Sequence, residues 1–137
     1  LHALERIIDA SENQLHVLKI ESGEYDLGNQ TLKMKPYVDI EGSGQESTII
    51  TSSAAYQQFS GGTSEGADHA ALSKLTVVSA NPNKTGSSSA MTNDGVSPKL
   101  SHATFIANGP ATNHPIVNKN SLPLLIGVTV IASGFSN

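Results

Sequence analysis

The sequence contains no cysteine and no tryptophan, and it has only three tyrosines and three phenylalanines. The absence of cysteine excludes disulfides, thiolate zinc sites and cysteine nucleophiles together. A shortage of aromatic residues is common in disordered chains, but such chains also have few aliphatic residues and a high net charge. In this chain valine, isoleucine and leucine are plentiful, and the formal net charge is only −4. We therefore expect a folded chain that is built largely from small residues.

Positive charge and long apolar runs are also scarce. Arg6 is the only arginine, and the lysines are scattered. Nucleic-acid binders usually carry clusters of arginine or lysine that displace counterions from phosphates, so we expect no nucleic-acid partner. The longest apolar run, residues 122–132, is interrupted by Pro123, Gly127 and Thr129. A membrane span needs roughly 18–20 apolar residues, and we therefore expect no membrane insertion.

The length of 137 residues is sufficient for one domain and too short for two ordinary ones. We expect a single domain over residues 1–137. Leu1 is not a natural start, so we interpret the sequence as a mature product or an excised piece, and whether a leader was removed stays open. The last expected strand reaches almost to Asn137, and we expect that the native protein continues beyond it or that another molecule covers this end.

The second half of the sequence repeats itself. Residues 90–109 align with residues 115–134 without a gap, at an offset of 25 residues, and residues 70–80 supply an earlier copy at an offset of 28. The shared pattern is a leucine, two variable residues, an apolar residue, a threonine and two more apolar residues. Repetition of this kind is the signature of repeat architectures.

The repeated pattern is typical of a short strand. Successive side chains of a strand point to opposite faces, so Leu75 and Val77 share one face while Thr76 and Val78 share the other. A unit of about 25 residues cannot bury its own apolar face, whereas stacked copies can. We therefore expect a parallel solenoid in which like residues stack on like.

The first half is less regular. Leu1, Leu4, Ile7 and Ile8 have helical spacing and predict a short amphipathic helix over residues 1–12 that caps the solenoid. Four-residue apolar segments at 17–20, 31–34, 37–40 and 47–50 are bounded by turn residues and predict short strands. Residues 52–66 have no period, and we expect them to form a loop that leaves the coil.

Residues 20–50, IESGEYDLGNQTLKMKPYVDIEGSGQESTII, resemble the opening of pectin-lyase-like right-handed β-helix proteins. The segments VSPKLSHATFIANG and LPLLIGVTVIASG resemble the repeats of bacterial cell-surface β-helix proteins. The resemblance covers nearly the whole chain except residues 52–66. It implies an all-β fold, a right-handed parallel β-helix with a short N-terminal capping α-helix. The superfamily includes polysaccharide lyases, hydrolases, esterases and proteins without a known reaction, so the fold does not give the function.

Two carboxylates are the first candidate site. Asp39 and Glu41 are two residues apart in an expected strand, so both side chains leave the same face. Paired carboxylates are suited to acid–base catalysis or to binding calcium. The simpler interpretation, which we favour, is that they form the solvent face of a strand whose Val38 and Ile40 point inward.

A second group combines Asp68 and His69 with Lys74 and His102, which would suggest a catalytic cluster. In the repeat alignment Lys74, His102 and Gly127 share one column. Three such different residues in one column are typical of an exposed position without constraint. We therefore expect no catalytic residue in this group.

The column Thr76, Thr104 and Thr129 is the third candidate. If these threonines point outward, the coil carries a stripe of threonine and aliphatic residues that is suited to binding ice, a glycan or another copy of the protein. The simpler interpretation is that one face of this strand lines the interior and the other packs under a loop. Asn93 and Asn118 also align, and we expect them to form a structural ladder of amide side chains.

These features lead us to expect a non-catalytic, secreted or cell-surface bacterial module for adhesion, carbohydrate contact or self-assembly. Its partner would be a polysaccharide or another copy of itself, with no metal and no cofactor. The alternative is a polysaccharide-active enzyme, a pectate-lyase-like lyase or a glycoside hydrolase, with its site partly beyond residue 137. The resemblance implies that such a lyase holds calcium with several acidic residues. No acidic residue follows Asp94, which argues against a lyase site on these repeats.

Overall fold

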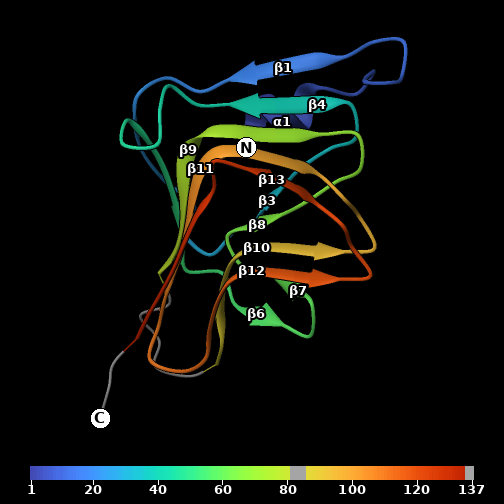
Figure 1. Cartoon of the computed structure of the whole chain (residues 1–137). Coiled ribbons are helices and arrows are strands. Elements are labelled where there is room, and N and C mark those ends of the chain that lie inside the picture. The colour runs from blue at the N-terminus through green and yellow to red at the C-terminus, as the bar shows by residue number, and fades with distance from the viewer. Residues whose placement is uncertain (81–85, 135–137) are drawn as a thin grey trace.

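The computed structural model describes residues 1–80 and 86–134 and shows an all-β solenoid of mainly parallel strands with one short N-terminal helix (Figure 1). This is the fold that the repeats predict. The helix is α1 (His2–Arg6), and the strands of the first half are β1 (His16–Lys19), β2 (Gly23–Asp26), β3 (Leu32–Lys33), β4 (Val38–Glu41), β5 (Thr48–Ser52), β6 (Tyr56–Gln57), β7 (Ser60–Gly61) and β8 (Ser64–Glu65). The strands of the second half are β9 (Ala71–Ala80), β10 (Ser88–Asp94), β11 (Lys99–Asn108), β12 (Asn113–Lys119), β13 (Leu124–Ile126) and β14 (Thr129–Ser133).

The strands stack into a coil with three faces. The first face has the order β1-β4-β9-β11-β13. The two long strands, β9 and β11, contribute only their first halves to this face. The second face contains β2, β5, the second halves of β9 and β11, and β14. The third face has the order β12-β10-β8-β3. We call each turn of the coil a rung. The five rungs are, in chain order, β1-β2-β3, β4-β5-β8, β9-β10, β11-β12 and β13-β14.

The core consists of columns of apolar side chains that continue from rung to rung. On the first face Leu18 pairs with Ile40, and the column continues through the other leucines in register. The interior members of this column are fully buried. Burial of one such side chain contributes roughly 1.5–3 kcal/mol. The three columns are Leu18, Ile40, Leu72, Leu100 and Leu125; Tyr25, Ile50, Val77, Phe105 and Val130; and Leu32, Ser64, Met91 and Ile116.

The long strands bend from the first face to the second at one residue per rung. Lys74, His102 and Gly127 lie at this bend with φ angles of 57°, 48° and 59°. All three are exposed, as the sequence predicts. The prediction that the position is without constraint is wrong, because a positive φ costs roughly 1–2 kcal/mol for a residue with a Cβ atom and nothing for glycine.

In the second rung the bend is expanded into the loop of residues 42–47. Gly42 begins this loop where the main chain of the next rung comes very close. A Cβ atom on Gly42 would lie 2.3 Å from the carbonyl oxygen of Lys74. The backbone N–H of Gly42 donates a hydrogen bond to Ser73 of that rung over 2.9 Å. The loop therefore leaves the coil only after its first residue has been fixed to the neighbouring rung.

The N-terminal cap is shorter than the predicted helix of residues 1–12. The helix ends at Arg6, and Ile7 has an extended backbone. Leu4 packs into the core with 3% of its surface exposed, whereas Ile8 is 89% exposed. Helical spacing predicted one apolar face for both residues, but the chain leaves the helix before that face is complete. In the described residues, no helix has the length and the apolar character that crossing a membrane requires.

The predicted loop excursion over residues 52–66 is only partly present. Strands β6 and β7 form a small antiparallel hairpin, which is the part that leaves the coil. Strand β8, in contrast, lies in the third face between β3 and β10. Its two residues are too few to show a sequence period, and Ser64 occupies a core column that is apolar in the other rungs. The Ser64 hydroxyl donates to the carbonyl of Ala90 over 2.6 Å, which satisfies it inside the core.

The predicted amide ladder is present. The Nδ2 group of Asn93 donates a hydrogen bond to Oδ1 of Asn118 over 2.8 Å, and Asn93 is fully buried. The ladder stops at the preceding rung, where Gly66 occupies the next place. A Cβ atom on Gly66 would lie only 2.0 Å from Oδ1 of Asn93. A side chain at Gly66 would therefore displace the first amide of the ladder.

The bend allows a test of the constraint at His102. We expect His102→Val to lower the free energy of unfolding by about 1–2 kcal/mol, because a β-branched residue is poorly tolerated at positive φ. His102→Gly should cause no comparable loss, since Gly127 already occupies this place in the next rung. Urea unfolding followed by circular dichroism measures the difference. Ser101→Val, at the neighbouring residue of the same strand, is the control, and equal losses at both positions would contradict the assignment.

Candidate functional site

The two candidate carboxylates lie on the outer side of β4, and Val38 and Ile40 point into the core. Oδ1 of Asp39 accepts a hydrogen bond from the backbone N–H of Ala71 over 2.9 Å. Oε1 of Glu41 lies 3.3 Å from the ammonium nitrogen of Lys74. Both carboxylates thus contact the next rung. This arrangement supports the simpler interpretation, in which they form the outer face of a strand whose Val38 and Ile40 point inward. Their use in catalysis or ligand binding stays a prediction.

Asp68 and His69, from the second candidate group, also have structural contacts of their own. Oδ1 of Asp68 accepts a hydrogen bond from the backbone N–H of Ser97 over 2.7 Å. The ring of His69 stacks on that of Tyr37, with 5.1 Å between the centroids and an angle of 2° between the planes. Among the residues that the structure describes, no group of three or more histidine, aspartate or glutamate side chains is arranged to hold a metal ion.

The threonine column is in register as the repeat predicts. Thr104 pairs with Thr76 on one side and with Thr129 on the other. The threonines alternate with the buried core residues Val77 and Phe105, so they point outward. The column is therefore a feature of the outer surface of the second face, and its role in binding stays a prediction.

The loop of residues 42–47 folds over the first part of this column. The Thr76 hydroxyl donates to the main-chain carbonyl of Gln45, and the Gln45 amide donates to Oγ1 of Thr104 over 3.2 Å. Thr76 is consequently only 8% exposed, while Thr129 is exposed. The loop and the column enclose a shallow polar hollow. Its lining residues are Gly44, Gln45, Glu46, Ser47, Thr76, Thr104 and Thr129.

The sequence predicted packing under a loop as one interpretation of the threonine column, but it did not identify which loop. The glycines of the segment EGSG indicated a turn, but nothing in the sequence placed Gln45 over a strand that begins at Ala71. The contact depends on the stacking of the second rung on the third. Both interpretations of the threonines therefore apply to different parts of the column, since its first member packs under a loop and its last member faces solvent.

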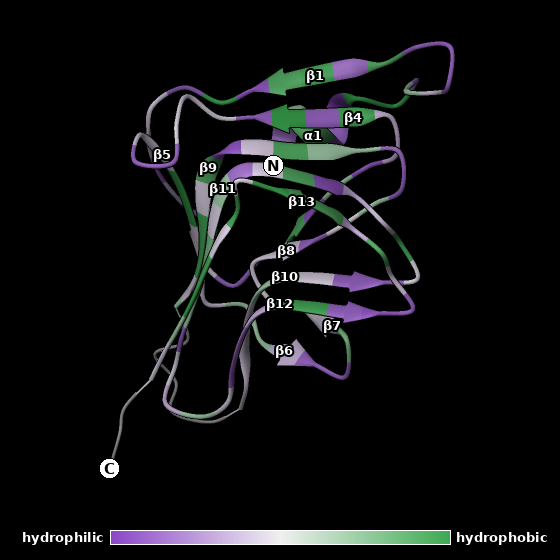
Figure 2. Ribbon diagram, viewed as in Figure 1, coloured by the Kyte–Doolittle hydropathy of each residue, from purple (hydrophilic) through white to green (hydrophobic). Residues whose placement is uncertain are grey.

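The most exposed apolar surface lies on the last rung. Figure 2 shows β13 as a hydrophobic segment at the end of the stack. Leu125 is 45% exposed although it continues a column in which Leu100 is fully buried. Val130 is 55% exposed and continues the column of the fully buried Phe105. Leu122, Leu124, Ile126 and Ile131 are further exposed apolar residues of this rung.

Strands β13 and β14 both pair with β11. In the part of the chain that the structure describes, no strand pairs with their opposite edges. We call this surface, with its apolar residues and its strand edges, the open end. Unpaired edges are ready templates for pairing with another chain. Leu125 and Val130 are exposed because they lie on the last rung, since their counterparts Leu100 and Phe105 are fully buried. Leu124 and Ile126, in contrast, lie on the outer side of β13, as Lys99 and Ser101 do in the preceding rung.

The contact of Asp39 with the third rung can be tested. We expect Asp39→Ala to lower the free energy of unfolding by about 1 kcal/mol, because the hydrogen bond from the Ala71 N–H is lost. Asp39→Asn keeps an oxygen acceptor and should retain most of the stability. Urea unfolding measures both, with Glu24→Ala on the exposed strand β2 as the control. A loss for Asp39→Ala no larger than for the control would contradict a structural role.

Comparison of the chain with models of protein families, with curated proteins and with solved structures gives no match. Of what the resemblance to pectin-lyase-like proteins implies, the structure shows the parallel β-solenoid architecture alone.

Proposed function

We propose that this chain is a non-catalytic β-helix module that assembles with a second copy of itself through the open end. The observation that carries the proposal is the exposure of core-column residues, Leu125 and Val130, on the last rung. Between interior rungs the same columns are fully buried, as Leu100 and Phe105 illustrate. The open end thus exposes apolar columns that a neighbouring rung covers elsewhere in the chain.

The energetic basis of this contact is the burial of apolar surface. Full burial of a leucine or valine side chain contributes roughly 1.5–3 kcal/mol, and these residues are about half exposed. Several of them act together on one rung, but association also costs free energy through lost translation and rotation. We therefore expect a weak dimer that forms at high protein concentration.

A pair of chains joined at their open ends is a closed assembly. The opposite end of the coil carries α1, whose Leu4 is buried against the first rung. A second copy cannot stack there in the same way without displacing the helix. Joining two identical surfaces around a two-fold axis closes the assembly, whereas head-to-tail joining of different surfaces generates filaments. The capped N-terminal end therefore favours a dimer over a fibre.

The resemblance of the repeats to bacterial surface proteins supports a secreted or cell-surface location, which we include in the proposal. Adhesion is the broader activity that such a module would serve.

Self-association can be tested at the open end. We expect Val130→Glu to raise the dissociation constant of the dimer at least tenfold, because it places a charge in a buried apolar contact. Ile8→Glu is the matched control, since Ile8 is 89% exposed beside the opposite end. Sedimentation equilibrium over a range of concentrations measures both variants. A wild-type chain that stays monomeric at millimolar concentration, or that forms open-ended filaments, would overturn the proposal.

Carbohydrate contact is a second candidate because of the polar hollow beside the threonine column. Hydroxyl, amide and carboxylate groups from Gln45, Glu46 and Thr129 line it, and these groups both donate and accept hydrogen bonds. Sugar hydroxyls require such paired donors and acceptors. The hollow lies on the outer surface and is not part of the core columns.

This second candidate predicts that the wild-type chain binds an insoluble polysaccharide and that Thr104→Val weakens the binding at least fivefold. The variant removes the hydroxyl and keeps the shape of the side chain. Thr51→Val, on the neighbouring outer column of β5, is the matched control. Sedimentation with a panel of acidic and neutral polysaccharides measures the binding, and equal binding by both variants would contradict the site. Release of unsaturated or reducing ends in the same assay, with or without calcium, would favour the enzyme alternative.

A further inference from the structure

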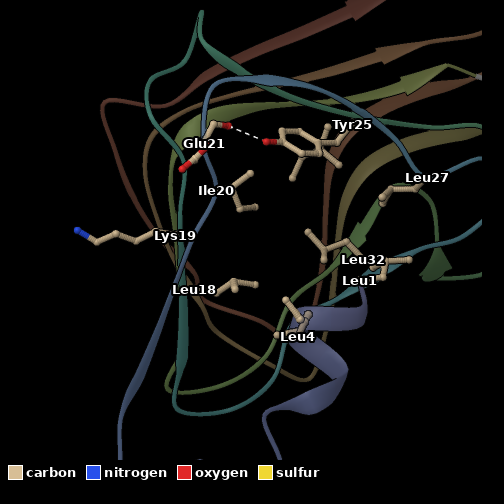
Figure 3. Close-up of a pocket in the computed structure, with 11 residues that line it drawn as sticks. Leu1, Leu4, Leu18, Lys19, Ile20, Glu21, Tyr25, Leu27 and Leu32 are labelled. Atoms are coloured by element: carbon tan, nitrogen blue, oxygen red, sulfur yellow. Dashed lines mark hydrogen bonds between the residues drawn. The ribbon is translucent and has the colours of Figure 1, made fainter.

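An apolar pocket lies at the N-terminal end of the coil, between α1 and the first rung. Figure 3 shows the side chains of Leu4, Leu18, Leu27 and Leu32 directed toward one shared space. Tyr25 closes the opposite side of this space. The pocket is separate from the open end, which lies at the other end of the stack (Figure 1).

The pocket follows from the shape of the cap. The first rung presents one core-column residue on each face, namely Leu18, Tyr25 and Leu32. Inside the stack the next rung covers such residues completely. At this end the five residues of α1 lie against the first rung, together with Leu1 and Ile7 on either side of the helix. Leu4 is buried, but Tyr25 remains 38% exposed, so part of the first rung is left uncovered.

The walls of the pocket are suited to a neutral molecule. The Tyr25 hydroxyl donates a hydrogen bond to the main-chain carbonyl of Glu21 over 3.0 Å, so this polar group is already partnered. Figure 3 shows the ammonium group of Lys19 directed away from the space. A charged ligand would therefore lose its hydration without gaining an ion pair. The hydroxyls of a sugar would be left unpaired for the same reason.

The size of the pocket sets the size of the ligand. Its volume is about 430 Å³. Ligand pockets typically measure roughly 300–1,000 Å³ and are predominantly apolar, and a dry apolar cavity of roughly 150 Å³ binds benzene. We propose that this pocket binds a neutral, predominantly apolar small molecule of about the size of two fused rings with short substituents. This inference does not depend on self-association.

The test uses the neutral naphthalene dye 6-propionyl-2-dimethylaminonaphthalene, whose fluorescence shifts to the blue in apolar surroundings. We expect saturable binding to the wild-type chain. We expect Ala3→Phe to weaken it at least tenfold, because Ala3 lines the pocket and is exposed, so the added ring fills the space without removing a core side chain. His2→Phe is the matched control. It adds the same ring to the same helix at a residue that does not line the pocket.

Two further variants distinguish binding in the pocket from binding elsewhere on the chain. Tyr25→Trp fills the space from the opposite wall, and we expect it to weaken dye binding as well. This variant provides an independent test if Ala3→Phe prevents the chain from folding. Val130→Glu alters the open end, and it should leave dye binding unchanged. Full binding by a folded Ala3→Phe or Tyr25→Trp chain would overturn the proposal. Loss of binding in Val130→Glu alone would also overturn it, because the dye would then occupy the open end.

Discussion

The structure depends on apolar side chains of one rung packing in register on those of the next. No rung can bury its own inward face, so each becomes stable only through its neighbours. The effect is visible in the exposure of equivalent residues. Leu72 and Leu100 are fully buried in the middle of the stack, whereas Leu125 in the same column is 45% exposed at its end. For these leucines, position in the stack, and not residue type, decides how much apolar surface each side chain buries.

The two ends of the coil are consequently the places where the requirement for a neighbour is not fully met. At the N-terminal end α1 meets it in part, with Leu4 buried and a pocket left beside it. At the other end the described chain presents apolar side chains and strand edges together. Both proposals therefore have one physical origin, although they concern different surfaces and different partners. A small neutral molecule fits the first end, and a large complementary surface fits the second.

The outer surface of the coil is shaped by contacts between rungs as well as by solvent. Asp39 and Glu41 hold the third rung through a backbone N–H and through Lys74. Gln45 bridges two members of the threonine column. Asp39 and Glu41 have the chemistry of a catalytic pair in the sequence. In the structure they connect neighbouring rungs. The hollow beside Thr129 is the part of this surface that keeps several polar groups together at the exterior.

The sequence alone specified the solenoid and the register of its second half, because side chains of a strand alternate with a period of two and the spacing of Leu72, Leu100 and Leu125 repeats from copy to copy. The amide pair of Asn93 and Asn118 followed from the same alignment. Only the packing of the rungs in three dimensions set where α1 ends, that Ser64–Glu65 joins the third face, and that the column of Lys74 requires a positive φ. These features depend on contacts between residues that are distant in the sequence. A local sequence pattern does not indicate which distant residues come into contact. The exposure of Leu125 and Val130 has the same origin, since their counterparts Leu100 and Phe105 are fully buried and only the last rung has no described neighbour on its far side.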